Sequence, residues 1–363
     1  MIFSRFDYLL LALILLVNLL GIVTIYSTQS RVEDVAVASK YWTKQLLWFL
    51  VGLVALFIVV LPDYKFFNAM APALFVAELL LLLLVFAVGV EMKGAKRWLS
   101  LGGFYLQPSE FAKLVFAIAL SSYFARFKDY DVGIKRLLVP AMMFVTMVVL
   151  IARQPDLGTA LVLVPIFVAI VFTAGLRVRI IIVCAIVLLL LVPLSWHTLK
   201  DYQRARITAF LNPQATVSGS GYQQYQSIIA VGSGGVWGKG FLQGTQSKLK
   251  FLPQQHTDLI FSAFAEEWGF FGVLVLLVLY AFIVLRLLEN ASLAKDRFGH
   301  FFCTGMAAFF FSHIFVNIAM VVGILPITGL PLPFMSYGGS FLLLNMVCIG
   351  IVINIRMRRF VFE

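Results

Sequence analysis

Ten apolar stretches dominate this sequence. They cover approximately residues 8–26, 45–62, 68–90, 108–125, 137–152, 158–174, 180–196, 258–287, 300–323 and 339–356. A helix needs about 20 apolar residues to cross the hydrocarbon layer of a bilayer. Backbone groups in lipid must be bonded internally, and these runs lack the alternation of barrel strands, so helices are expected. The sequence therefore predicts an all-α polytopic membrane protein, a single transmembrane domain over residues 1–363 with about ten transmembrane helices.

The composition excludes several classes of protein. Hydrophobic residues make up 62% of the chain and charged residues 12%, against about 45–50% and about 25% in soluble domains. An ordinary soluble enzyme, a disordered chain and a DNA-binding module are therefore excluded. The net charge of +11 fits basic residues that orient a membrane protein, so no nucleic-acid partner is expected. All three cysteines lie in apolar runs, so no disulfide framework is implied.

The basic residues predict the orientation of the chain. With the N-terminus inside, fourteen Lys and Arg residues fall in the inner segments and seven in the short outer loops. Because inner loops carry the excess of positive charge, both termini are expected in the cytoplasm.

The longest connection, about 197–257 between the seventh and eighth predicted helices, then lies outside. Loops longer than about 15 residues are usually functional or disordered. Here many glycines alternate with Tyr222, Tyr225, Trp237 and Phe241, which favours an ordered loop folded onto the membrane surface. The function is expected on this outer face.

The fourth predicted helix begins with charged residues. Glu110 and Lys113 are three positions apart, so they share a helix face and can pair. One interpretation is a capped helix start, since Pro108 and Glu110 suit the first turn. The other is a charged cavity near the outer surface. Arg97 and Trp98 lie in the preceding loop, where a cation and an indole suit an anionic headgroup.

The eighth predicted helix begins at His256-Thr257-Asp258. Thr257 or Asp258 could simply cap the helix. Alternatively, a partly desolvated aspartate at the boundary between membrane and water is suited to act as a general base. Glu266 and Glu267 point in directions about 100° apart on this helix, so at least one is expected to pair with another helix.

The glycine-rich segment 232–240 does not match the phosphate loop of nucleotide-binding proteins, so nucleotide binding is rejected. Its backbone amides could still bind an anionic group. The four histidines lack zinc-ligand spacing, so a metal held by the protein is not expected. His313 and Asn317 are four apart and are expected to make interhelical hydrogen bonds. The segment 324–340 contains three prolines and three glycines among its residues, so it cannot be a continuous helix.

Ten short motifs, read together, resemble one known family. They are KGAKRW (93–98), QPSEFAK (107–113), QPDLGT (154–159), FLNP (210–213), GSGG (232–235), GKG (238–240), GTQS (244–247), HTD (256–258), EE (266–267) and PLPFMSYGG (331–339). This set is similar to that of the SEDS proteins (shape, elongation, division and sporulation), which include RodA, FtsW and SpoVE. The 93–98 loop, the leucine of the 154–159 motif and the short tails are more similar to RodA.

The resemblance implies a bacterial peptidoglycan glycosyltransferase in the cytoplasmic (inner) membrane. Members polymerise lipid II, with undecaprenyl-diphosphate-linked glycan as second substrate, beside a class B penicillin-binding protein transpeptidase. Similarity to RodA implies a role in cell elongation and rod shape. The resemblance also implies that Asp258 matches the essential aspartate of the family and that Glu110 and Lys113 match its charged pair. Arg97 and Trp98 fall on the loop that closes over this cavity.

The chemistry of such a reaction suggests roles for the charged residues. The donor sugar is α-linked and the product is β-1,4-linked, so one inverting displacement suffices. It needs a base for the acceptor hydroxyl, here Asp258, and positive charge for the leaving diphosphate. Lys113, Arg97, Lys239 and Arg206 are the candidates for that charge. A divalent cation, Mg²⁺ or Mn²⁺, could share the task.

Two other functions fit parts of the sequence. A lipid II flippase could use the intramembrane Glu78, Glu110 and Lys113 as a translocation path. The absence of a strong internal repeat and the gathering of polar motifs on one face favour the enzyme. A scaffold that only recruits the transpeptidase would tolerate neutralisation of Asp258.

Overall fold

A computed structural model describes most of the chain. The described residues are 6–29, 35–92, 95–102, 104–127, 133–180, 182–183, 186, 201–211, 219–248 and 255–359.

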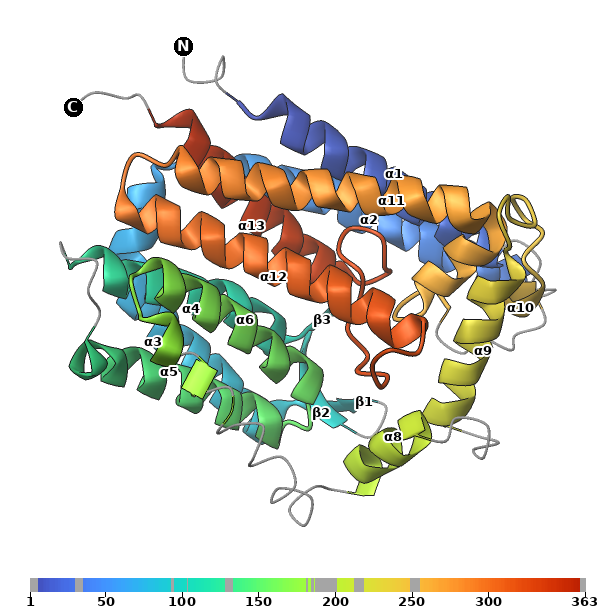
Figure 1. The fold of residues 1–363 in the computed structure, drawn as a ribbon, viewed down its shortest axis with the longest axis horizontal. Coiled ribbons are helices and arrows are strands. Elements are labelled where there is room, and N and C mark those ends of the chain that lie inside the picture. Colours follow the sequence, from blue (N-terminus) through green and yellow to red (C-terminus); the bar gives the residue numbers. More distant parts are fainter. Residues whose placement is uncertain are drawn as a thin grey trace.

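The protein is a bundle of long, roughly parallel and antiparallel helices (Figure 1). Its long helices are α1 (Tyr8–Gln29), α2 (Val35–Val60), α3 (Tyr64–Val88), α4 (Pro108–Ala125), α5 (Ile134–Arg153), α6 (Leu157–Thr173), α11 (Ile260–Ser292), α12 (Arg297–Val321) and α13 (Gly339–Met357). In the described residues, nine of the ten predicted spans coincide with these helices. Most of the other span, 180–196, lies outside the described residues. The all-α polytopic fold class is confirmed, whereas the count of ten remains a prediction.

Seven helices in the described part of the chain are long and apolar enough to cross a membrane. Two predicted spans are not among them. The apolar helix α6 has 17 residues, and α4 has 18 residues that include Glu110 and Lys113 in its first turns. Both are packed inside the bundle, since α4 contacts α3, α12 and α6. α4 is shielded by its neighbours, so it tolerates two charged residues, whereas α6 is strongly apolar, exposes Leu161 and Phe172, and differs from the seven only in its shorter length.

The core lies along α12 and α13. Within their most apolar windows, 67% of the residues of α12 and 83% of those of α13 are buried, against 17% in α5. α13 packs mainly on α2, and α12 packs on α11, α6 and α4. The helices α1, α2, α3, α5 and α11 lie around these two and expose many apolar side chains, as expected for surfaces that face lipid.

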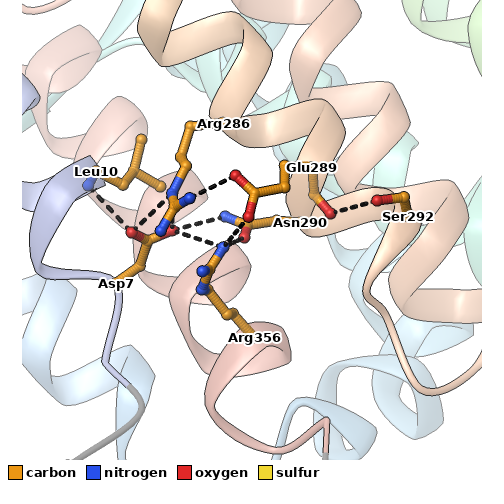
Figure 2. A network of polar contacts seen from close by, with 7 residues as sticks. All are labelled: Asp7, Leu10, Arg286, Glu289, Asn290, Ser292 and Arg356. Atoms are coloured by element: carbon orange, nitrogen blue, oxygen red, sulfur yellow. Dashed lines mark hydrogen bonds and ion pairs between the residues drawn. The ribbon is translucent and has the colours of Figure 1, made fainter.

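An ionic network joins three helices at one end of the bundle (Figure 2). The carboxylate of Asp7, which has no exposed side-chain surface, lies 3.1 Å from Nε of Arg286 and 3.4 Å from Nη1 of Arg356. Asn290 donates a further hydrogen bond of 3.1 Å to it. The start of α1, the end of α11 and the end of α13 are therefore held together. Asp258, which precedes α11, lies at the opposite end.

A small antiparallel sheet lies at that opposite end. Its strands are β1 (Val90–Met92), β2 (Ala95–Leu101) and β3 (Phe104–Leu106), in the order β1-β2-β3. Val90 lies opposite Trp98, and Leu99 opposite Leu106. The sequence predicted only a loop here, because strands of three residues are too short for a periodic pattern.

Three helices occupy the described parts of the long segment 197–257, which the charge bias predicts to be outside: α8 (Asp201–Leu211), α9 (Ser220–Ser233) and α10 (Thr245–Lys248). α9 packs against α11 and α12, and α8 packs against α9 (Figure 1). The expectation of an ordered segment is confirmed for these residues, which pack on the bundle; its position on the membrane surface remains a prediction.

Candidate functional site

Asp258 lies in the turn that leads into α11, and it is partly exposed. The motif between α12 and α13 supports this turn. Ser336 Oγ donates a hydrogen bond of 2.7 Å to the carbonyl of Thr257. The backbone amide of Tyr337 donates one of 2.9 Å to the carbonyl of His256. The non-helical segment predicted from its prolines and glycines thus holds the candidate base in place.

Aromatic rings lie beside this turn. The ring centroids of Tyr41 and His256 are 4.6 Å apart, and those of Tyr41 and Tyr337 are 5.1 Å apart. Burial, and then the neighbouring Tyr41 phenol, raises the pKa of Tyr337. Its hydroxyl therefore stays protonated at neutral pH. Rings of this kind beside a carboxylate are suited to contact a sugar face.

Four residues, Thr328 to Pro331, form the segment closest to Asp258, and we call them the 328–331 segment. Gly329 adopts φ +77°, and a Cβ atom built on it would lie 3.4 Å from Oδ2 of Asp258. Arg206 Nη1, on α8, donates a hydrogen bond of 3.3 Å to the carbonyl of Thr328. The structure thus places the predicted cation Arg206 and the predicted base Asp258 against the same short segment.

Glu110 and Lys113 form the predicted pair. Lys113 Nζ lies 2.6 Å from Oε2 of Glu110, and the Lys113 side chain is only 1% exposed. The ammonium also lies 5.5 Å from the ring centroid of Phe309 and 5.2 Å from that of Phe341. An ion pair enclosed in this way is desolvated, so its charges act over a longer range than at a surface.

His313 and Asn317 connect this pair to Asp258. Lys113 Nζ lies 3.4 Å from Nε2 of His313, whose Nδ1 lies 3.2 Å from the carbonyl oxygen of Pro331. Asn317 Nδ2 donates to the carbonyls of Leu330 and Asp258, at 2.7 and 2.9 Å. The expected interhelical contact is confirmed for His313, which meets Lys113 of α4. It is wrong for Asn317, whose bonds in the described residues go to non-helical backbone.

Arg97 is held by a turn rather than left free. Its Nε donates a hydrogen bond of 2.9 Å to the carbonyl of Gln154, and its Nη2 donates to the carbonyl of Pro155. Its Nη1 lies 3.6 Å from Oδ1 of Asp156. Trp98, the next residue on β2, is partly buried. Arg97 therefore fastens the small sheet to the start of α6.

Asp156 is a polar centre that reasoning from the sequence did not select. It accepts hydrogen bonds from Gln107 Nε2 at 2.8 Å and from Ser109 Oγ at 3.0 Å, and it caps α6 through the amide of Thr159. The signal was present in the motif QPDLGT, in which an aspartate precedes an apolar helical run.

Lys239 is also bound. Its Nζ lies 2.7 Å from Oε1 of Glu266 and 2.7 Å from Oγ1 of Thr245. Neither Lys239 nor Arg97 is thus presented as an unpaired cation. The other glutamate, Glu267, accepts a hydrogen bond from Ser27 Oγ on α1, which confirms the expected pairing with another helix.

The glycine-rich loop is bonded into a break in α11. Gly269 has φ 62° and ψ −163°, which interrupts the helix. The amides of Lys239 and Gly240 donate to the carbonyls of Glu266 and Glu267, at 3.0 and 2.9 Å. These two amides are thus occupied, and the expectation that the loop amides could bind an anion is wrong for them.

The comparison with protein families agrees with this architecture. Residues 7–360 match the family model FTSW_RODA_SPOVE, described as cell cycle protein. The chain belongs to this family. The small sheet, the 328–331 segment and the turn at Asp258 are therefore features of a member of the FtsW, RodA and SpoVE family.

Named relatives cover nearly all of the chain. Peptidoglycan glycosyltransferase MrdB of Escherichia coli K12 is 41% identical over 85% of this chain and 83% of its own. Peptidoglycan glycosyltransferase RodA of Treponema pallidum is 33% identical over 98% of both chains. Stage V sporulation protein E of Bacillus subtilis is 35% identical over 96% of both.

Solved structures share the fold. A chain from work described as "Structural coordination of polymerization and crosslinking by a peptidoglycan synthase complex" has a TM-score of 0.83 and 31% identity, over 98% of both chains. RodA of Thermus thermophilus has a TM-score of 0.74 and 29% identity, also over 98% of both.

Proposed function

We propose that this multi-pass membrane protein is a peptidoglycan glycosyltransferase that polymerises lipid II. Relatives that carry this name are 33–41% identical over most of the chain. The observation that carries the mechanism is the position of Asp258. This residue is partly exposed at the end of the bundle opposite the Asp7 network, and it lies close to a segment that Arg206 also contacts.

Asp258 is the general base of this proposal. The 4-hydroxyl of the acceptor sugar gives its proton to the Asp258 carboxylate, and its oxygen bonds to the anomeric carbon of the donor. The bond from that carbon to the diphosphate breaks, and the diphosphate leaves with the electron pair. The configuration inverts once, from α to β. Because the diphosphate leaves as a stabilised anion, no general acid is required.

Arg206 is the candidate that supports the leaving group. It contacts the carbonyl of Thr328, next to the residue that touches Asp258. Lys113 is enclosed and paired with Glu110, so it acts on the site through its field and through its neighbours. Arg97, Trp98 and Lys239 shape the outer walls, since both cations are bound to carboxylates.

A divalent cation fits this site only if it binds together with the diphosphate of the substrate. Within the described residues, no three His, Cys, Asp or Glu side chains gather into a metal-binding group. Mg²⁺ commonly keeps several waters and takes its ligands from one or two carboxylates and from phosphates. Asp258 would be the carboxylate nearest to such an ion.

The membrane orientation follows from the charge bias. With both termini in the cytoplasm, the turn at Asp258 faces the outside, where lipid-linked glycan is presented. A class B penicillin-binding protein is the proposed partner, since a similar chain belongs to a complex that couples polymerisation with crosslinking. Similarity to RodA and MrdB supports a role in cell elongation and rod shape.

The test is polymerisation of purified lipid II in detergent by the chain with its transpeptidase partner. We expect Asp258→Asn to abolish glycan chains, while Asp63→Asn, an exposed helix cap at the other end of the bundle, retains them. Glycan chains of wild-type yield from folded Asp258→Asn would remove Asp258 from the mechanism. Because detergent abolishes sidedness, failure of the wild type to make polymer would favour the flippase.

A further inference from the structure

The contacts of His313 define its tautomer. Its Nδ1 lies 3.2 Å from the carbonyl oxygen of Pro331, which can only accept a hydrogen bond. Its Nε2 lies 3.4 Å from the ammonium of Lys113, which can only donate. The ring is therefore neutral, with its proton on Nδ1 and its lone pair on Nε2. The imidazole therefore accepts a hydrogen bond from Lys113 at Nε2 and donates one to the carbonyl of Pro331 from Nδ1.

The orientation of the Asn317 amide is defined in the same way. Its Nδ2 lies between the carbonyls of Leu330 and Asp258, at 2.7 and 2.9 Å, so both of its N–H groups are used. A flipped amide would place oxygen against two oxygens. Asn317 is four residues after His313 on α12, so both side chains project from one face of that helix.

His313 and Asn317 each make one hydrogen bond to the 328–331 segment, which is not helical. The segment is held at Pro331 by His313 and at Leu330 by Asn317, and Gly329 lies against the Asp258 carboxylate. A shift of the segment therefore moves the surroundings of that carboxylate. Asn317 also holds the carbonyl of Asp258 itself.

We propose that His313 and Asn317 are positioning residues for glycosyl transfer. They hold the Glu110–Lys113 pair, the 328–331 segment and Asp258 at fixed separations, so the base keeps its place when the substrate arrives. This inference rests on the proposed function, in which Asp258 takes the acceptor proton. It assigns the buried ion pair an action at a distance, through two side chains of α12, rather than direct contact with substrate.

The bundle offers matched controls at its other end. Asn354 Nδ2 also donates to two backbone carbonyls, those of Val59 and Pro62, at 3.0 and 2.6 Å. His300, also on α12, has Nδ1 2.9 Å from the carbonyl of Ala291. Asn354 matches the two bonds of Asn317, and His300 matches the Nδ1 bond of His313 at a partly exposed position. Both lie far from Asp258, so their substitution reports the structural cost of losing such bonds.

Two substitutions of His313 separate its two contacts. In His313→Asn the amide nitrogen can replace Nδ1 and keep the bond to Pro331, but the acceptor for Lys113 is lost. In His313→Gln the amide oxygen can replace Nε2 as acceptor, but the bond to Pro331 is lost. Because a misplacement of about 1 Å can cost about 100-fold in rate, we expect each variant, and Asn317→Ala, to lower kcat about 10- to 100-fold. KM for lipid II should change by less than about threefold, since binding contacts remain.

The experiment measures kcat and KM for lipid II polymerisation, and the melting temperature, for these variants with Asn354→Ala, His300→Asn and Asp258→Asn. The inference is supported if Asn317→Ala and Asn354→Ala have equal melting temperatures and only Asn317→Ala has a reduced kcat. Equal kcat in both overturns it. If folded Asp258→Asn polymerises like the wild type, Asp258 is not the base and this inference falls with it. If the wild type makes no polymer, the proposed function itself fails, so the two failures are distinguishable. On the wild type, ¹⁵N NMR should show a protonated Nδ1 in His313, assigned by comparison with His313→Gln. A protonated Nε2 would overturn the inference without any variant.

Discussion

The ammonium of Lys239 lies 2.7 Å from Oε1 of Glu266, a carboxylate with no exposed side-chain surface. The same oxygen accepts hydrogen bonds from the amides of Thr245 and Gln246, at 2.7 and 3.1 Å. One buried carboxylate thus gathers three separate positions of the outer segment onto α11. A cation that the sequence offered as a ligand for diphosphate instead holds the wall of the site.

Replacement of Lys239 by methionine should therefore lower the stability of the protein and leave its affinity for substrate nearly unchanged. The substitution leaves Glu266 with its amide bonds but without its cation, so the free energy of unfolding should fall by about 1–3 kcal/mol. KM for lipid II should stay within a factor of about three. Thermal unfolding in detergent and steady-state polymerisation measure the two quantities.

Lys96→Met is the control for this substitution. The ammonium of Lys96 likewise makes two hydrogen bonds, but they go to the backbone carbonyls of Phe86 and Ala87, and Lys96 is exposed. Its loss should cost less than about 1 kcal/mol. A large rise in KM for Lys239→Met with unchanged stability would restore the diphosphate role for this lysine.

Gly269→Ala should prevent the loop from joining α11. The φ and ψ values of Gly269 lie in a region that is essentially restricted to glycine. A Cβ there would lie 2.2 Å from the amide nitrogen of Gly238, so strain and overlap add. We expect a loss of more than about 3 kcal/mol in unfolding free energy, together with faster hydrogen exchange at residues 235–246.

Gly232→Ala, in the glycine-rich segment that bonds to this break, is the matched control, because a Cβ there meets no atom within 4 Å. It should leave both stability and hydrogen exchange close to those of the wild type. Similar behaviour of the two variants would contradict the role of Gly269 as the break that admits the loop.

The sequence predicts the helices of this protein well, because the length of an apolar run is a local property. It predicts the break at Gly269 poorly, since the composition on both sides of that glycine is equally helical. The sheet was missed because β1 and β3 have three residues each, too few for alternation to appear.

The sequence identified the charged residues of the candidate site but not the residues that most of them contact. Glu110 and Lys113 lie on one turn of helix, so their pairing followed from spacing. Arg97 and Lys239 are held by carboxylates far away in sequence, at Asp156 and Glu266. Such pairs depend on how helices pack, which a single sequence does not contain.

Arg97→Lys should weaken the attachment of the small sheet. The guanidinium makes two hydrogen bonds to the turn before α6 and an ion pair with Asp156, and a lysine ammonium cannot reproduce this fork. We expect a loss of about 1–3 kcal/mol in unfolding free energy. Limited proteolysis between β1 and β3 should become faster.

The rate of cleavage within the small sheet, residues 90–106, thus provides the direct readout for Arg97. KM for lipid II should stay within a factor of about three, because Arg97 is bound to protein groups. A rise in KM above tenfold, with proteolysis at the wild-type rate, would show instead that the guanidinium contacts substrate.

Asp7→Asn tests whether the ionic network at the other end serves stability alone (Figure 2). Asp7 faces both Arg286 and Arg356 with no exposed side-chain surface. Without the charge of Asp7, the exposed carboxylate of Glu289 remains as the acidic partner of both arginines, so the cost should lie at the lower end of about 3–5 kcal/mol. The exposed pair of Asp63 and Arg358 should contribute less than about 1 kcal/mol, so Asp63→Asn is the control.

Because the network lies at the opposite end from Asp258, kcat per folded molecule of Asp7→Asn should equal that of the wild type. A lower kcat in the folded fraction would mean that α11 transmits the state of this network to the turn at Asp258.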